Sequence, residues 1–377
     1  MSTIGRYLAR EIVASVLFVL FGFLALFAFF DLVNELDDIG RGGYKLQYAL
    51  GYVALGLPSR IYEVMPIAAL IGTIFALAQF AAHSEFTAMR AAGLGRRRAL
   101  SAIIAVGIWF ALGTAVVGEV LTPQAEKLAQ KVRLSAIGGA VAGQFRSGLW
   151  IRDTVKDAKG KVERMRFVNI GELMPDTSLR AVRIFEFDRE FRLVEITDAD
   201  SGRFVPPRTW RLEPARRTMF EPVIVADQAV ALRATRSELA QADWDSELNP
   251  DLLGVLMLVP ERMSAWTLVQ YVRHLRDNQQ SADRYEIALW KKVVYPIAVI
   301  VMMALALPFA YLQVRAGGIG YKVFAGIMLG VAFHFLNSLF SNLGLLNTWP
   351  AWVAASTPSV FAAILALAML AWVDRAH

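Results

Sequence analysis

The stretch "SEFTAMRAAGLGRRRAL" (residues 84–100) is short, basic and amphipathic, and it lies between two long apolar runs. Two interpretations are open: a basic loop that only connects two membrane spans, or a short helix that docks onto a partner. Ser84 is suited to cap a helix, Glu85 falls in its first turn, and Gly93 is suited to end it. These signals favour a docking helix at residues 84–93.

The composition of the whole chain indicates a membrane protein. The 377 residues are 56% hydrophobic, and the mean hydropathy of +0.44 is too high for a soluble protein of this size. The net charge of +6 is typical of cytoplasmic loops and lipid headgroup contacts in such a protein, so we expect no nucleic-acid partner. Cysteine is absent, which excludes thiol redox catalysis and any disulfide.

Six apolar runs are long enough to cross a bilayer, which takes roughly 20 residues of helix. The first lacks the small-residue cleavage site of a signal peptide, so we expect it to be retained. The second apolar region, Leu46–Ala82, is longer than one crossing and is interrupted by Pro58 and Pro66, so we expect an interfacial piece followed by a span. The predicted spans are Ile12–Phe30, Tyr62–Ala82, Ala99–Leu121, Val293–Gln313, Val323–Leu339 and Trp352–Trp372.

The basic residues of the short loops predict the orientation of the chain. One side of the predicted bundle carries Arg6, Arg10, Arg90, Arg96, Arg97, Arg98, Arg315 and Lys322. The opposite side carries Asp31, Glu35, Asp37 and Asp38 against only Arg41 and Lys45. Both termini are therefore predicted to be cytoplasmic, and the long middle segment is predicted to lie outside.

The middle segment predicts an inserted all-β domain. Stretches such as "GLWIRDTV", "RAVRIFEFD" and "EPVIVAD" are short, rich in Val, Ile, Phe and Trp, and separated by Gly, Pro and Asp. We expect a β-sandwich or jelly-roll-like domain with helical flanks. Its interior, used either as its own core or to hold acyl chains, is predicted to include Trp150, Phe167, Phe185, Phe187 and Trp210.

The predicted organisation has three parts. Residues 1–122 hold three spans and the docking helix, residues 123–280 the β-domain with its flanks, and residues 281–377 the last three spans. The fold class is thus an α-helical membrane protein with six transmembrane helices, split three and three around a jelly-roll-like all-β domain.

Motifs for catalysis are missing from the sequence. It contains no phosphate-binding loop, no H-E-x-x-H and no G-x-S-x-G, so we expect no catalytic residue, cofactor or metal. A polar stripe instead runs along the fifth span: His334, Asn337, Ser338, Ser341 and Asn342. It is interpreted either as hydrogen bonding between packed helices or as the lining of a polar cavity or subunit seam.

Several stretches resemble the LptF/LptG family of lipopolysaccharide export permeases. They are "RYLAREI", "MPIAALIGTIFALAQFAAHSEFTAMRAAGL", "GEVLTPQAEKLAQKVR" and "YEIALWKKVVYPIAVIVMMALALPF", which together cover most of the membrane part. The stretch "SGLWIRD" resembles the LptG branch more than the LptF branch. This resemblance implies a non-catalytic permease subunit in the inner membrane of a Gram-negative bacterium, with the β-domain in the periplasm.

The resemblance also implies partners and site residues. The partners are a sibling permease LptF, a cytoplasmic ATPase LptB dimer, a periplasmic bridge component LptC, membrane lipids and lipopolysaccharide as cargo. The ATPase contact falls on Glu85, Phe86, Met89 and Arg90. The cavity or rim for the cargo falls on Arg41, Lys45, Arg133, Lys291, Lys292, His334, Asn337 and Ser338.

One feature disagrees with the pattern of the family. LptG members tend to carry basic residues at the outer end of the first span, where this sequence has Asp31, Asp37 and Asp38. Carboxylates repel phosphates, so these residues are not expected to contact headgroups directly unless a divalent cation bridges them. Glu119, at the outer end of the third span, is expected to pair locally. Alternative functions are a permease for another lipid or lipoprotein, which would usually have four spans, and a membrane-anchored sensor or scaffold.

Overall fold

The computed structural model describes residues 3–40, 43–93, 95–137, 148–156, 162–174, 176–225, 229–246, 248–250, 253, 259–278, 280–311 and 319–375. Within these residues, six helical segments are long and apolar enough to cross a membrane, as predicted. The helices that form them are α1 (Thr3–Leu36), α2 (Leu46–Ala82), α4 (Arg96–Val116), α8 (Asp283–Ala306), α10 (Ile319–Leu346) and α11 (Ala351–Arg375).

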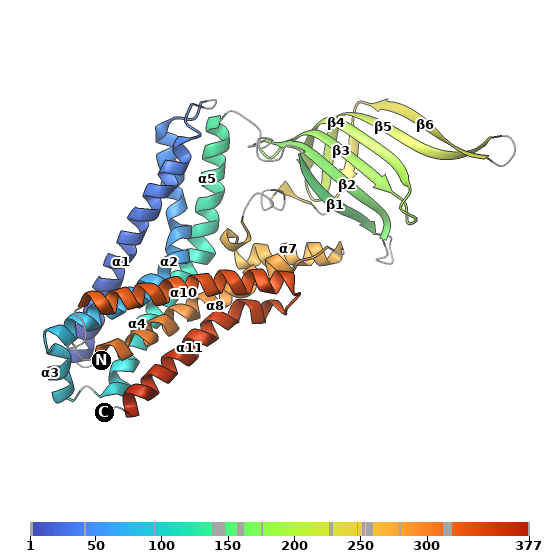
Figure 1. Cartoon of the computed structure of the whole chain (residues 1–377). Helices are drawn as coiled ribbons and strands as arrows, with labels where there is room; N and C mark the ends of the chain where they lie inside the picture. The colour runs from blue at the N-terminus through green and yellow to red at the C-terminus, as the bar shows by residue number, and fades with distance from the viewer. Residues whose placement is uncertain are drawn as a thin grey trace.

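Shorter elements connect these spans. Between α2 and α4 lies α3 (Glu85–Ala91), and α4 continues through a π-helical segment η1 (Val117–Leu121) into α5 (Thr122–Ile137). After the β-domain come η3 (Pro260–Arg262) and α7 (Ala265–Asp277), and α9 (Pro308–Tyr311) follows α8. Both chain termini and α3 lie at one end of the bundle, and the β-domain lies at the other (Figure 1).

Helix α2 is continuous through both of its prolines. The expected interfacial piece followed by a separate span is wrong, because Pro58 and Pro66 both lie inside one helix of 37 residues. The most apolar 18-residue stretch of α2 is 78% buried, against 17% for that of α10, so α2 is the central helix of the bundle. Close packing offsets the backbone hydrogen bond that each proline removes. Gly72 lets α1 and α2 approach each other closely, since a Cβ atom there would lie 2.5 Å from the Cα of Val16 in α1.

Three helices extend past the thickness of a membrane. The 21 residues of α4 rise about 31 Å at ~1.5 Å per residue, which matches the hydrocarbon core. The 37 residues of α2 rise about 55 Å, and the 16 residues of α5 add about 24 Å beyond η1. The parts of α1, α2 and α5 beyond the level of η1 form a helical tower, seen in Figure 1.

The inserted β-domain is one antiparallel meander. Its strands are β1 (Leu149–Lys156), β2 (Val162–Leu173), β3 (Leu179–Phe187), β4 (Leu193–Val205), β5 (Thr209–Val225), β6 (Ala229–Leu239) and β7 (Ala242–Asp245). The first six pair in chain order, and β7 pairs with β5. Strands β6 and β7 lie end to end along the same edge of β5, because β6 pairs with residues 215–225 and β7 with residues 209–212. The predicted all-β domain is therefore confirmed, and its described strands form a single sheet.

The two faces of this sheet differ from the prediction. Trp210 lies in the buried core with Val168, Ile184 and Trp244, as expected. Trp150, Phe167, Phe185 and Phe187 instead lie on the opposite face, where Trp150 stacks on Phe185 and is 53% exposed. In "RFVNI" the buried positions are Val168 and Ile170, so the smaller aliphatic residues face the core and Phe167 faces away.

Candidate functional site

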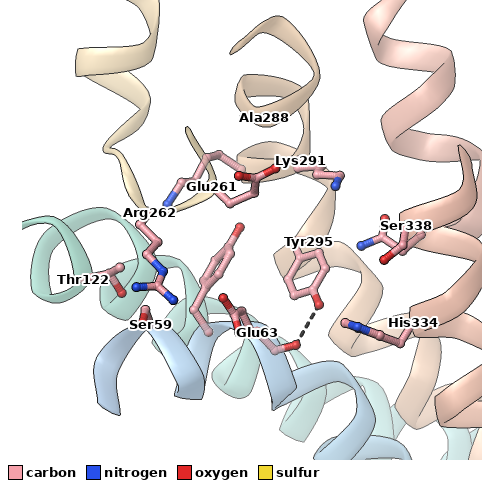
Figure 2. A pocket seen from close by; sticks show the side chains of 13 residues that line it. Ser59, Glu63, Thr122, Glu261, Arg262, Ala288, Lys291, Tyr295, His334 and Ser338 are labelled. Atoms are coloured by element: carbon pink, nitrogen blue, oxygen red, sulfur yellow. Dashed lines mark hydrogen bonds between the residues drawn. The ribbon is translucent and has the colours of Figure 1, made fainter. Parts of the chain in front are cut away.

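A polar cavity of about 210 Å³ lies where α2, α8 and α10 meet the start of α5 and η3. Figure 2 shows its side chains converging from these elements. Five of the predicted rim residues, from α8 and α10, line it together: Lys291, Lys292, His334, Asn337 and Ser338. The other lining residues are Ser59, Tyr62, Glu63, Thr122, Glu261, Arg262, Ala288 and Tyr295. Three residues of the predicted polar stripe, His334, Asn337 and Ser338, therefore line a cavity, which was one of the two open interpretations.

Lys292 links the cavity to the π-helical segment. Its Nζ donates to the backbone oxygen of Gly118 at 2.9 Å and lies 4.7 Å from the centre of the Tyr62 ring. The Tyr62 ring packs so closely on Gly118 that a Cβ atom there would lie 2.4 Å from it. It also stacks on Tyr295 with ring centres 5.1 Å apart. A π-helix leaves carbonyl groups poorly paired, and Lys292 supplies a charged donor to one of them.

Three buried polar atoms of the cavity have no hydrogen-bond partner among the described residues. They are the hydroxyl of Tyr62, Oγ1 of Thr122 and Oε2 of Glu261. Tyr62 is 8% exposed and Thr122 only 1%. Buried polar groups are nearly always paired, so three unpaired atoms in one cavity indicate a place for water or for polar groups of a ligand.

The charges of the neighbouring tower are paired with each other. Arg60 of α2 donates to Asp31 of α1 at 2.6 Å and to Glu63 at 3.0 Å. Arg133 of α5 bonds to Asp38, and its Nη2 lies 3.7 Å from Glu35. Two of the acidic residues that depart from the family pattern therefore have a structural role, because Asp31 pairs with Arg60 and Asp38 pairs with Arg133.

Tyr44 completes this network near the top of the tower. Its hydroxyl donates to Glu35 at 2.7 Å, and both side chains are buried. Burial, together with this hydrogen bond to a carboxylate, raises the pKa of Tyr44 well above its ordinary value. The guanidinium of Arg133 also lies 5.3 Å from the Tyr52 ring centre. Arg133, a predicted rim residue, is therefore held by the tower and does not line the cavity.

The segment after the β-domain is fastened to the same level of the bundle. Both carboxylate oxygens of Glu119 accept from the backbone N–H of Ala265, the first residue of α7, at 2.9 Å. Arg262 donates to Glu126 of α5 at 2.6 Å. The prediction that Glu119 pairs locally is confirmed. These contacts tie η3 and α7 to the end of the third span.

At the opposite end, α3 packs back onto the bundle. Phe86 is 4% exposed and meets the Tyr311 ring of α9 edge to face at 5.2 Å. Met89 is 8% exposed. Arg90 lies over the same Tyr311 ring at 5.5 Å, and Glu85 accepts from the Tyr7 hydroxyl of α1 at 3.1 Å. Phe86 and Met89 therefore anchor α3, while Thr87, Ala88, Arg90 and Ala91 are exposed.

The ends of α3 agree only partly with the prediction. Gly93 follows the helix with φ +94°, a conformation that suits glycine, so the predicted end is confirmed. Ser84 precedes the helix with φ 60°, and its side chain makes no capping hydrogen bond. The predicted Ser84 cap is wrong because α2 runs to Ala82 and the turn to α3 leaves Ser84 in the left-handed region.

The predicted rim residue Lys45 lies apart from the cavity, because it precedes α2 at the top of the tower, and it is exposed. The predicted rim residue Arg41 lies outside the described residues. Tyr62, Thr122 and Glu261 were missed, although they carry the unpaired atoms. Their only signal in the sequence is a polar group beside the end of a predicted span, which many membrane helices share.

The comparisons with known proteins agree on one family. The model of the family described as "Lipopolysaccharide export system permease LptF/LptG" matches residues 6–372. The chain is 29% identical to LptG of Escherichia coli (strain K12) over 97% of both chains. It is 27% identical to LptG of Haemophilus influenzae over 98% of both. The similarity to LptF of Escherichia coli (strain K12) is 30% identity over 29% of this chain and 30% of LptF.

Proposed function

This chain belongs to the LptF/LptG family and is a permease subunit of a lipopolysaccharide export system, and we propose which of its parts contact the ATPase and the cargo. In this proposal α3 receives force from a separate cytoplasmic ATPase, and the polar cavity holds phosphate groups of lipopolysaccharide. The chain resembles LptG over its full length and LptF over a part, which supports pairing with an LptF sibling. Its six apolar helices and its similarity to LptG support a multi-pass protein of the inner membrane.

The cationic cavity at the end of the spans is the observation that carries the cargo proposal. Lys291 and Lys292 supply positive charge there, and the hydroxyls of Tyr62 and Thr122 supply unpaired donors. Phosphate oxygens accept from both kinds of group. Glu261 faces the same cavity and would repel a bare phosphate, so its carboxylate takes a hydroxyl group of the sugar or a bridging water. Acyl chains would lie along the exposed apolar faces of α1 and α10.

The orientation in this proposal follows from the basic α3 end. That end carries Arg90, Arg97 and Arg98 as well as both termini, which favours the cytoplasm. The β-domain then lies in the periplasm, where β1 and β6, each with one edge that no described strand pairs, suit β-augmentation by a bridge component such as LptC.

Photocrosslinking tests the cargo site. A photoreactive amino acid replaces Lys291 or Asn337 in the cavity, Arg133 in the tower, or Ile364, which is 60% exposed on α11. The photoreactive residues at the two cavity positions are expected to crosslink to lipopolysaccharide, and the control at Ile364 is not. Labelling at Arg133 would add the tower to the cargo path. Equal labelling at Ile364 and at Asn337 would contradict a specific cavity.

Association with the ATPase tests the role of α3. Glu85→Ala is expected to weaken ATPase binding by at least about 30-fold, the cost of truncating one partner of a hydrogen-bonded charge pair at an interface. Glu190→Ala changes a carboxylate that is 65% exposed in the β-domain and serves as the control.

Tyr7→Phe separates two explanations of that result. It removes the hydrogen bond to Glu85 and leaves the carboxylate free for a partner. We expect at most about a tenfold loss of ATPase binding, the worth of one ordinary hydrogen bond. If Tyr7→Phe is as damaging as Glu85→Ala, Glu85 acts through α1 and does not contact the ATPase.

A further inference from the structure

Helix α7 presents two different faces. Leu268, Tyr271, Val272 and Leu275 are buried and pack with Ala288 of α8. The exposed face carries Trp266, which is 70% exposed, then Val269, Arg273 and Arg276. These residues are three or four apart, so they form one stripe along the helix. A large exposed Trp at the start of such a stripe needs a partner surface.

The start of α7 lies at the edge of the hydrocarbon core. Its first backbone N–H bonds to Glu119, just past the 21 residues of α4 that rise about 31 Å. Lys292 lies at the same level, because its Nζ bonds to Gly118. The neighbouring Trp290 is 43% exposed. Exposed Trp residues gather at this depth in membrane proteins, where the ring meets both apolar and polar surroundings.

The other end of α7 points away from the membrane, toward the β-domain. Asn278, which follows the helix, bonds to Thr154 of β1. Arg276 bonds to Glu286, in the part of α8 that precedes Lys292 and so lies beyond the edge of the core. Along the exposed stripe, the apolar residues therefore come first, at the hydrocarbon edge, and the arginines follow, farther out. A bilayer has the same order, with acyl chains below and phosphates above.

We propose that the exposed stripe of α7, defined by Trp266, Val269, Arg273 and Arg276, rests in the lipid headgroup layer on the β-domain side and binds anionic phospholipids. Trp266 and Val269 enter the layer and Arg273 contacts the phosphates, while Arg276 stays paired with Glu286. Because α7 is bonded to β1 through Asn278, this contact sets the height of the β-domain above the membrane. The inference needs only that α4 spans the bilayer, and it is independent of the cargo and of the ATPase.

The absence of cysteine makes the test direct. One cysteine is introduced at Trp266, and a fluorophore on it is quenched by nitroxides carried on lipid headgroups, deep in the acyl chains, or in water. The full chain, alone and with its sibling permease, is placed in phosphatidylethanolamine–phosphatidylglycerol vesicles. Matched controls are Trp109→Cys, 77% exposed near the middle of α4, and Leu232→Cys, 72% exposed on β6.

The expected result is a ranking of the three quenchers. The label at residue 266 is quenched most by headgroup nitroxides, the label at 109 by deep nitroxides and the label at 232 by aqueous ones. Strong aqueous quenching at 266, equal to that at 232, would overturn the proposal. Protection at 266 from all three quenchers would also overturn it, because a protein and not lipid would then cover the stripe.

A charge variant gives a second readout. Arg273→Gln, added to the labelled chain, is expected to raise aqueous quenching at residue 266 by up to about fivefold, the loss per basic residue near an anionic surface. Arg233→Gln, an exposed position on β6, should leave the signal unchanged. The effect of Arg273→Gln is expected to vanish in phosphatidylcholine vesicles. An equal effect in both kinds of vesicle would contradict headgroup binding.

Discussion

The tower and the cavity are two polar clusters on the same central helix, and they differ in the partners of their polar groups. In the tower, Arg60 and Arg133 each bond to carboxylates of α1 or of the loop that follows it, and among the atoms of these two guanidinium groups only Nε of Arg133 is buried without a partner in the described residues. In the cavity, the hydroxyls of Tyr62 and Thr122 are buried and unpaired among the described residues. Paired charges fix helices to each other, whereas unpaired groups leave bonding capacity for something that arrives later.

This difference separates a structural role from a binding role without reference to conservation. Both clusters hold arginine or lysine, so charge alone would assign lipopolysaccharide to either. Only the partners of those cations distinguish them. The tower is therefore expected to matter for stability and the cavity for cargo, and three variants test that division.

The largest expected effect is on the tower. Arg133→Gln leaves Glu35, which is 7% exposed, and Asp38 without their cation. Loss of one member of a buried ion pair costs about 3–5 kcal/mol of unfolding free energy. Thermal unfolding of the purified chain measures it, with Lys131→Gln, an exposed position on the same helix, as the control. If Arg133→Gln leaves the stability unchanged but abolishes crosslinking of the cargo, Arg133 has a binding role.

An intermediate effect is expected in the cavity. Lys292→Met removes the charged donor of Gly118 and a cation that faces the cargo. Crosslinking of lipopolysaccharide at Asn337 is expected to fall about 10- to 100-fold, as for loss of a hydrogen bond to a charged group. Lys292→Arg should retain most of the crosslinking, and Lys45→Met, far from the cavity, should retain all of it. Full crosslinking in Lys292→Met would remove Lys292 from the cargo site.

The smallest effect concerns one unpaired hydroxyl. Thr122→Val keeps the shape of the side chain and removes an oxygen that has no partner among the described residues. Stability without cargo is expected to stay equal or to rise, within about 1 kcal/mol, because an unpaired buried hydroxyl is a cost. Thr114→Val is the matched control, since its hydroxyl donates to the backbone of Phe110 at 2.7 Å. That variant should lose about 1 kcal/mol. Equal losses in both variants would mean that Thr122 is paired.

Much of the membrane part could be predicted from the sequence. The lengths of the apolar runs indicated six spans, and the spacing of His334, Asn337 and Ser338 indicated a polar face on α10. Gly93, which follows the segment 84–92, indicated where α3 ends. These features depend on local periodicity and on the dimensions of a bilayer, both of which a sequence contains.

The rest depended on packing that no local pattern records. Pro58 and Pro66 suggested a break, but burial of α2 among its neighbours keeps the helix continuous. Phe167 looked like a core residue because of its size, and the register of β2 with β3 places it on the outer face. Tyr62, Thr122 and Glu261 come from three distant segments, so their convergence became visible only in the fold.

The continuity of α2 through its two prolines has a mechanical consequence. A helix about 55 Å long behaves as a stiff lever, so a tilt of about 5° at one end displaces the other by about 5 Å. The α3 end of α2 and the top of the tower are the two ends of that lever. A small rotation of α2 at its α3 end would therefore produce a larger displacement at the top of the tower, because a continuous helix does not bend to take up the motion.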